Sequence, residues 1–303
     1  MADFQRRWTD GESPEKCLRR WAVISKCPAV DNGEWTGFER RQILVKGCEL
    51  SIRIGGRPDG EVVLLSHSIL TNSAIWATQA QLLVSLGFRV ICVDTRGHGQ
   101  SAASAPPYSM DNLVADVVAV LDDLRVSQVH FVGVSQGGMV GLGLGVIHPE
   151  RLLSLLVVAA RADAPPLFAA AWDERVAIVE RNDSVAELAE PTAERWFGKD
   201  FLHANPSVAD ALSQCINKTS AKGFIGCARA IQGLNYLSRV PTISARTTLV
   251  IGELDELLLQ PMRDLVPTIP NAVLHEIAGA GHLPQIDQAE RFQEILLLHF
   301  RDA

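Results

Sequence analysis

Short apolar runs, separated by segments of mixed polarity, recur along most of the chain. The runs are rich in valine, isoleucine and leucine and are bounded by glycine, aspartate and other turn-forming residues. They lie at residues 42–46, 50–54, 62–65, 90–93, 129–132, 152–160, 248–251 and 273–277. Runs of this length and composition predict buried β-strands, the first two of them paired through a turn.

Helical periodicity fills most of the intervals between these runs. Residues 110–124 carry apolar side chains at every third or fourth position with aspartates on the opposite side, which predicts an amphipathic helix. A similar pattern at residues 75–86 ends at Gly87, a helix stop, and a last helix runs through residues 292–300. Alternating helices and near-continuously apolar strands predict a mostly parallel central sheet covered by helices on both faces.

One long helix-rich segment interrupts this alternation. It covers residues 161–245, and the strand–helix pattern resumes after it. A chain of 303 residues is long enough for one α/β core with an insertion. The predicted division is an N-terminal extension over residues 1–40, a core over residues 41–160 and 246–303, and a helical insertion over residues 161–245.

Composition and charge narrow the classes of partner. The chain is 47% hydrophobic and 21% charged, as expected for a globular protein with a large core. The net charge is −7 and no run is rich in lysine or arginine, so we expect neither nucleic acid nor a membrane as partner. The first residues lack the apolar core of a signal peptide, and no apolar run approaches roughly 18 residues.

Cysteine usage agrees with a cytoplasmic protein. The six cysteines lie far apart and form no Cys-x-x-Cys pair; they are Cys17, Cys27, Cys48, Cys92, Cys215 and Cys227. Reduced thiols in the cytoplasm are the simplest interpretation, with Cys92 as a core residue of a predicted strand. A bridge between Cys17 and Cys27 is the alternative.

The turn after the fifth apolar run has the pattern of a nucleophile elbow. It reads Gly133-Val134-Ser135-Gln136-Gly137-Gly138 and leads into a segment of small apolar residues that suits a helix packed on the sheet. Strand, Gly-x-Ser-x-Gly turn and helix together hold a serine in a strained conformation, and the flanking glycines remove side chains that would collide there. Ser135 is therefore the predicted nucleophile.

A serine hydroxyl needs a base, and the base needs a carboxylate to orient it. On this architecture these residues follow the serine in the order acid, then histidine. Asp255 lies in the loop after the first strand that follows the insertion, and His282 lies in a glycine-rich loop after the last strand. Carboxyl ends of parallel strands meet at one sheet edge, so the sequence predicts a triad of Ser135, His282 and Asp255, with Glu253 and Glu256 as alternative acids.

Acyl transfer also needs hydrogen-bond donors for the oxyanion. The predicted donors are the backbone N–H groups of Gln136, next to the nucleophile, and Ile69, in the loop after the third predicted strand. Ser68 neighbours Ile69 and is a predicted substrate-binding residue. His67, in the same loop, is assigned a structural hydrogen-bonding role. Four other histidines, considered as the catalytic base, are expected to be structural or solvated: His130, His148, His275 and His299.

A further motif resembles a known family. The run Asp94-Thr95-Arg96-Gly97-His98-Gly99-Gln100-Ser101 resembles the D-x-R-G-x-G-x-S loop of α/β-hydrolases. Together with the elbow and the triad, the match extends from about residue 42 to the end. Four features are similar to 3-oxoadipate enol-lactone hydrolases: Leu65-Ser66-His67-Ser68-Ile69 ahead of Trp76, the Asp94-Thr95-Arg96 start, Ala159-Ala160-Arg161, and Ala171-Trp172-Asp173-Glu174-Arg175.

The resemblance implies the α/β-hydrolase fold, with the insertion as a helical cap over the site. It implies that Trp172 lies over the substrate and that Arg161 binds a substrate carboxylate, which suits a guanidinium fork. A core tryptophan and a solvated arginine are the alternatives. The chain departs from the family at Leu70, where relatives tend to have glycine, and in the 40 or so residues before its first strand.

The functional interpretation is a cytoplasmic serine hydrolase that opens a lactone or a small carboxylic ester. We expect it to need no metal and no organic cofactor. Whether the substrate bears a carboxylate, and whether the chain forms a homodimer, stay undecided at this point. Enzymes that cleave carbon–carbon bonds of meta-cleavage products and cofactor-free haloperoxidases or perhydrolases share the scaffold and are alternatives. A hydrolase-fold receptor with slow turnover is a further alternative, because fold and function are separable.

Overall fold

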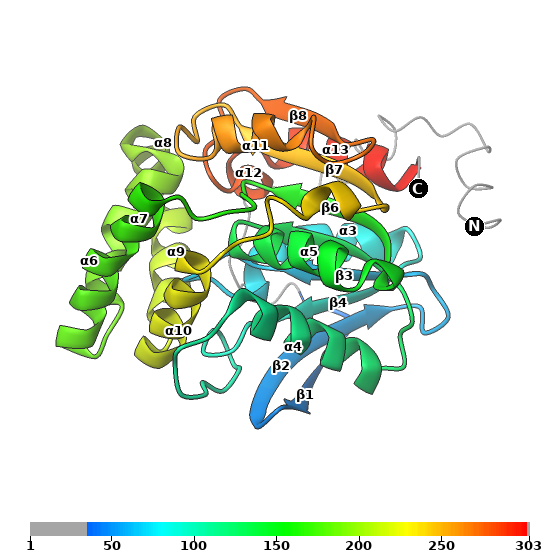
Figure 1. Cartoon of the computed structure of the whole chain (residues 1–303), viewed down its shortest axis with the longest axis horizontal. Helices are drawn as coiled ribbons and strands as arrows, with labels where there is room; N and C mark the ends of the chain where they lie inside the picture. The colour runs from blue at the N-terminus through cyan, green and yellow to red at the C-terminus, as the bar shows by residue number, and fades with distance from the viewer. Residues whose placement is uncertain (1–34, 302–303) are drawn as a thin grey trace.

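An eight-stranded sheet lies at the centre of the computed structural model, which describes residues 35–301 (Figure 1). Its strands are β1 (Phe38–Val45), β2 (Cys48–Gly56), β3 (Val62–Ser66), β4 (Arg89–Val93), β5 (Val129–Val134), β6 (Leu152–Val158), β7 (Arg246–Gly252) and β8 (Val273–Ile277). They are ordered β1-β2-β4-β3-β5-β6-β7-β8. Only β2 pairs antiparallel with its two neighbours, so the predicted mostly parallel sheet is confirmed.

Helices cover both faces of the sheet, as the alternating pattern predicts. They are α3 (Ala77–Ser85), α4 (Met110–Asp123), α5 (Gln136–Ile147), α11 (Leu259–Leu265), α12 (Pro284–Asp287) and α13 (Ala289–Arg301). In Figure 1, α4, α5 and α11 lie in front of the sheet, and α3 and α13 lie behind it. Nearly every residue of α5 is buried, which explains why this helix lacks a polar side.

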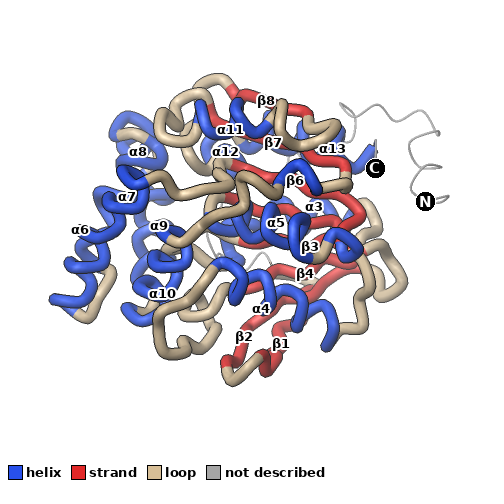
Figure 2. The backbone as a smooth tube through the Cα atoms, viewed as in Figure 1, coloured by secondary structure: helices blue, strands red, loops and turns tan. Residues whose placement is uncertain are grey.

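The insertion between β6 and β7 is helical. It forms α6 (Pro166–Asn182), α7 (Ala189–Phe197), α8 (Lys199–Ala204), α9 (Pro206–Asn217) and α10 (Ala221–Gln232). Figure 2 shows these helices gathered on one side of the sheet, and the long helix α6 packs along α10 through the ring contact of Trp172 with Phe224. A helical cap on an α/β core is therefore confirmed.

Element boundaries differ from the predictions in two places. Strand β1 begins at Phe38, inside the segment predicted as an extension, and its full length pairs with β2. It is an edge strand whose first half carries charged, exposed side chains, so no apolar pattern marks where it begins. Strand β6 stops at Val158, short of the predicted residue 160, because Ala159 has a positive φ of 46° that breaks the extended backbone.

Other predictions concern the cysteines and the termini. In the part of the chain that the structure describes, Cys48, Cys92, Cys215 and Cys227 are buried, and Cys92 lies in β4 as predicted. The alternative Cys17–Cys27 bridge lies outside the described residues, as does most of the predicted extension. Among residues 35–301, no helix is long and apolar enough to cross a membrane.

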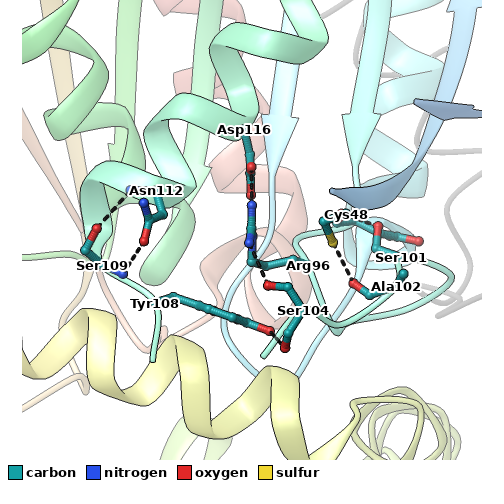
Figure 3. Close-up of polar contacts among 10 residues, drawn as sticks. Cys48, Arg96, Ser101, Ala102, Ser104, Tyr108, Ser109, Asn112 and Asp116 are labelled. Carbon is teal, nitrogen blue, oxygen red and sulfur yellow. Dashed lines mark hydrogen bonds and ion pairs between the residues drawn. The ribbon is translucent and has the colours of Figure 1, made fainter. Parts of the chain in front are cut away.

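A buried ion pair fixes the loop that follows β4 (Figure 3). Arg96 donates from Nε and Nη2 to the two carboxylate oxygens of Asp116 on α4, at 2.6 and 2.5 Å. Its Nη1 donates to Ser104 Oγ at 2.8 Å, and its guanidinium lies 5.1 Å from the centre of the Tyr108 ring. Burial raises the pKa of the Asp116 carboxyl, and the Arg96 charge opposes this rise. The pair therefore binds the loop to a core helix.

We predict that Asp116→Asn destabilises the fold by about 3 kcal/mol or more, because it leaves the buried charge of Arg96 without a counter-ion. Urea denaturation measures this change. The matched control is Asp122→Asn on the same helix, where the carboxylate binds Arg151 but is 62% exposed. That control is expected to cost less than about 1 kcal/mol. Equal losses in the two variants would contradict the structural role of the buried pair.

Candidate active site

Ser135 occupies a sharp turn between β5 and α5. Its φ of 56° and ψ of −117° are unusual for a residue with a side chain, and such backbone strain collects at functional sites. The Ser135 N–H donates to the carbonyl of Val158 at 2.7 Å, which ties the turn to the neighbouring strand β6. The structure thus places this serine as the elbow pattern predicts, at the carboxyl edge of the sheet and the N-terminus of a helix.

The two glycines flanking the serine are required by close backbone contacts. A Cβ atom on Gly133 would lie 2.3 Å from the Gly137 carbonyl oxygen. A Cβ atom on Gly137 would lie 2.3 Å from the Ser66 carbonyl oxygen at the end of β3. Real Cβ atoms do not approach backbone oxygens so closely, so the Gly-x-Ser-x-Gly spacing follows from packing of the turn against its own helix and against β3.

His282 and Asp255 form a hydrogen-bonded pair at the same sheet edge. His282 Nδ1 lies 2.7 Å from Asp255 Oδ2, and both side chains are buried, with 4% and 6% of their surface exposed. A carboxylate only accepts, so Nδ1 is the donor, and in the neutral form of the ring the lone pair lies on Nε2. The alternative acid Glu253 instead accepts the Gly279 N–H at 3.1 Å, and Glu256 is exposed.

The cap contacts the histidine directly. The Trp196 ring of α7 stacks on the His282 ring, with centroids 5.4 Å apart and planes 24° apart. The backbone N–H of His282 donates to the backbone carbonyl of Trp196 at 2.8 Å. On the core side, Asp287 Oδ2 accepts the Gly281 N–H at 2.6 Å. Sequence reasoning missed Trp196 and Asp287, because no local motif marks them and only the placement of α7 and α12 brings them to this loop.

The loop after β3 is bonded to the first turn of α5. The His67 carbonyl accepts the Gly137 N–H at 3.1 Å, and the Ser68 carbonyl accepts both the N–H and the hydroxyl of Thr71. Leu70 has a positive φ of 64°, a conformation that is unfavourable for leucine and natural for glycine. These bonds set the direction in which the loop's backbone N–H groups point.

The His67 side chain bonds this loop to the loop after β4, and its ring has a fixed protonation state. Its Nδ1 lies 2.7 Å from the Ser68 carbonyl and must donate, while its Nε2 accepts the Thr95 N–H at 2.8 Å. Burial lowers the pKa of His67, which keeps the ring neutral. His67 therefore links two loops in the structure, as its predicted hydrogen-bonding role requires.

The two predicted oxyanion donors belong to the two segments that the bond from the Gly137 N–H to the His67 carbonyl joins. Gln136 is the first residue of α5, where a helix leaves its N–H groups without intrahelical acceptors, and the helix dipole favours negative charge. Ile69 and Ser68 are buried in the loop after β3. Within residues 35–301, neither the Gln136 nor the Ile69 N–H is used in a hydrogen bond, and Ser68 Oγ has no partner. Both N–H groups therefore remain available to donate a hydrogen bond.

Arg161 and Trp172, taken from the family resemblance, have partners within the protein. Arg161 donates to the carbonyl and the carboxylate of Asp163, at 2.5 and 2.9 Å, and its guanidinium lies 4.3 Å from the Phe168 ring centre. Trp172 is buried in the cap between Phe168 and Phe224. Among the described residues, neither side chain forms a hydrogen bond, ion pair or ring contact with Ser135, His282 or Asp255.

Three comparisons relate the chain to known proteins. The profile of the alpha/beta hydrolase fold family matches residues 61–289. A 3-oxoadipate enol-lactonase of Acinetobacter baylyi is 31% identical over 250 residues, which cover 82% of this chain and 92% of that protein. A putative carbamate hydrolase, RutD, of Variovorax paradoxus is 29% identical and covers 82% and 94%. The crystal structure of the enol-lactonase from Burkholderia xenovorans superimposes with a TM-score of 0.81 at 27% identity, covering 86% and 100%.

We predict that Gly137→Ala destabilises the fold by about 2–3 kcal/mol, because the Ser66 backbone must move away from the new methyl group. Gly233→Ala is the matched control, since its Cβ would lie no closer than 3.6 Å to any atom, and we expect a change below about 0.5 kcal/mol. Urea denaturation measures both. A Gly137→Ala protein as stable as the control would refute the packing argument for the elbow.

Proposed function

The chain belongs to the α/β-hydrolase family, and from this premise we propose that it is a serine hydrolase that opens a lactone or a small carboxylic ester. The observation that carries the proposal is the hydrogen bond between His282 Nδ1 and Asp255 Oδ2, on the sheet edge that presents the strained Ser135. The name of one relative, a 3-oxoadipate enol-lactonase, supports this substrate class.

In the proposed mechanism, Ser135 Oγ attacks the substrate carbonyl while His282 Nε2 accepts the hydroxyl proton. Asp255 holds the imidazole with Nε2 free and stabilises the imidazolium that forms. The tetrahedral intermediate collapses when His282 returns the proton to the leaving oxygen. An acyl-enzyme remains on Ser135, and the leaving alcohol of a lactone stays attached to the acyl group. Water, activated by His282, then hydrolyses this ester.

The backbone N–H groups of Gln136 and Ile69 are the proposed donors to the oxyanion. The α5 dipole adds to their effect, because negative charge develops at the N-terminus of a helix. A single donor of this kind contributes about 3 kcal/mol to transition-state stabilisation. The bond from the Gly137 N–H to the His67 carbonyl holds the two donor segments together before substrate arrives, so the site needs little reorganisation. Ser68, buried beside Ile69, is a proposed substrate contact.

We predict that Ser135→Ala lowers kcat/KM at least about 1,000-fold for p-nitrophenyl butyrate and for γ-butyrolactone, because the acyl-enzyme cannot form. Ser184→Ala is the matched control, since Ser184 lies in the loop after α6 and its hydroxyl accepts only the nearby Ala186 N–H. The control is expected to keep wild-type kinetics. If Ser135→Ala hydrolyses these substrates as fast as wild type, the proposal is wrong.

A panel of substrates that includes meta-cleavage diketone acids separates ester hydrolysis from hydrolysis of carbon–carbon bonds.

A further inference from the structure

Two neighbouring backbone N–H groups hold the segment that carries His282. The Gly281 N–H donates to Asp287 Oδ2 at 2.6 Å, and the His282 N–H donates to the Trp196 carbonyl at 2.8 Å. A Cβ atom on Gly281 would lie 2.0 Å from the Trp196 carbonyl oxygen and 3.3 Å from Asp287 Oδ2. The backbone therefore passes through a gap that fits only glycine, between α7 of the cap and Asp287 of α12. A change in either bond is transmitted to His282.

Of these two acceptors, only Asp287 can change its charge. A backbone carbonyl stays neutral, whereas a carboxylate accepts a hydrogen bond more strongly than the protonated acid does. The distance of 2.6 Å is short for an N–H donor, as expected for a charged acceptor. Asp287 Oδ1 is buried and, within residues 35–301, has no hydrogen-bond partner. The charge of this carboxylate is therefore only partly compensated.

Burial opposes the ionisation of Asp287. It raises the pKa of the Asp287 carboxyl to about 7, while the N–H group of Gly281, and after it those of Asp287 and Gln288, oppose the rise. Near neutral pH the carboxyl is therefore present in both its charged and its neutral form. The bond to the Gly281 N–H weakens when the proton is added, because the acceptor loses its charge.

Other ionisable groups lie on the segments around Asp287. They are Glu194 and Arg195 of α7, Glu253, Asp255 and Glu256 of the loop after β7, His282, and Glu290, Arg291 and Glu294 of α13. In the described part of the chain none of them forms an ion pair with Asp287, and the His282 ring is bonded to Asp255 instead. The ionisation of Asp287 therefore depends chiefly on burial and on backbone N–H groups.

We propose that Asp287 is a positioning residue for His282, whose charged form holds the Gly281–His282 segment in the geometry that the reaction needs and whose neutral form holds it less well. This inference rests on the proposed hydrolase function. Asp287 acts through the backbone, since its bond is to the Gly281 N–H and not to the His282 ring. The rate of hydrolysis then follows the ionisation of a carboxyl group outside the triad.

The test compares kcat/KM of wild type and of Asp287→Asn for p-nitrophenyl butyrate at pH values from 5.5 to 8.5. Asparagine is a neutral acceptor of similar shape, so it reproduces the protonated form of Asp287 at every pH. We expect wild type to exceed the variant about 10-fold at pH 8.5 and to match it at pH 5.5, with the change centred near pH 7. Proton uptake by His282 is common to both proteins and cancels in this ratio.

Asp264→Asn is the matched control, since the Asp264 carboxylate on α11 is exposed and accepts a bond from Gln260. We expect the ratio of wild type to this control to stay near 1 at both ends of the pH range. A ratio for Asp287→Asn that is the same at pH 5.5 and pH 8.5 overturns the proposal, because a purely structural role would not follow the ionisation of Asp287.

Thermal melts separate positioning from a loss of stability. A carboxyl whose pKa is raised on folding contributes stability that is fully present below its ordinary pKa of 3.8 and is lost as the pH rises to about 7. Asparagine keeps this contribution, so we expect the Tm of Asp287→Asn to exceed that of wild type by more at pH 8 than at pH 5. The variant thus becomes more stable than wild type where it becomes less active. A Tm below that of wild type at both pH values overturns the proposal.

The two proposals fail in different ways. If Asp287 has no positioning role, wild type hydrolyses the ester in a reaction that depends on Ser135, and the ratio of wild type to Asp287→Asn does not vary with pH. If the hydrolase function is wrong, Ser135→Ala and wild type are equally active or equally inactive at every pH, and both proposals are overturned.

Discussion

The strained backbone of Ser135 is the constraint on which the rest of the site depends. A φ of 56° is maintained because the Ser135 N–H is bonded to the carbonyl of Val158 and the next residue begins helix α5. The same tight turn excludes side chains at Gly133 and Gly137 and allows β3 to approach α5 closely enough for the His67 carbonyl to accept the Gly137 N–H. Nucleophile and oxyanion loop are thus positioned by one piece of packing.

The cap contributes to the geometry of the core as well as covering it. Trp196 binds His282 through both its ring and its carbonyl, and a Cβ on Gly281 would lie 2.0 Å from that carbonyl. The ring of the proposed base is therefore held between the Asp255 carboxylate on one side and a cap helix on the other.

Local sequence patterns predicted most of the fold and the residues that follow strand ends. Ser135, Asp255 and His282 lie at positions that strand–helix alternation and glycine spacing mark clearly. Edge strand β1 was partly missed, because its exposed charged side chains dilute the apolar pattern. Trp196 and Asp287 carry no such mark, since their contacts with the His282 loop depend on how separate helices pack. Arg161 and Trp172 were predicted from the resemblance alone. In the structure Arg161 pairs with Asp163 and Trp172 packs against Phe224.

The central claim is that Ser135 is a nucleophile activated by the His282–Asp255 pair. The most direct measurement is labelling of the native enzyme with a fluorophosphonate, followed by intact mass determination and peptide mapping. The account predicts one adduct per chain, located on Ser135, with a rate that falls by at least about 100-fold in Asp255→Asn. An enzyme that stays unlabelled, or that carries its adduct on another residue, would contradict the account.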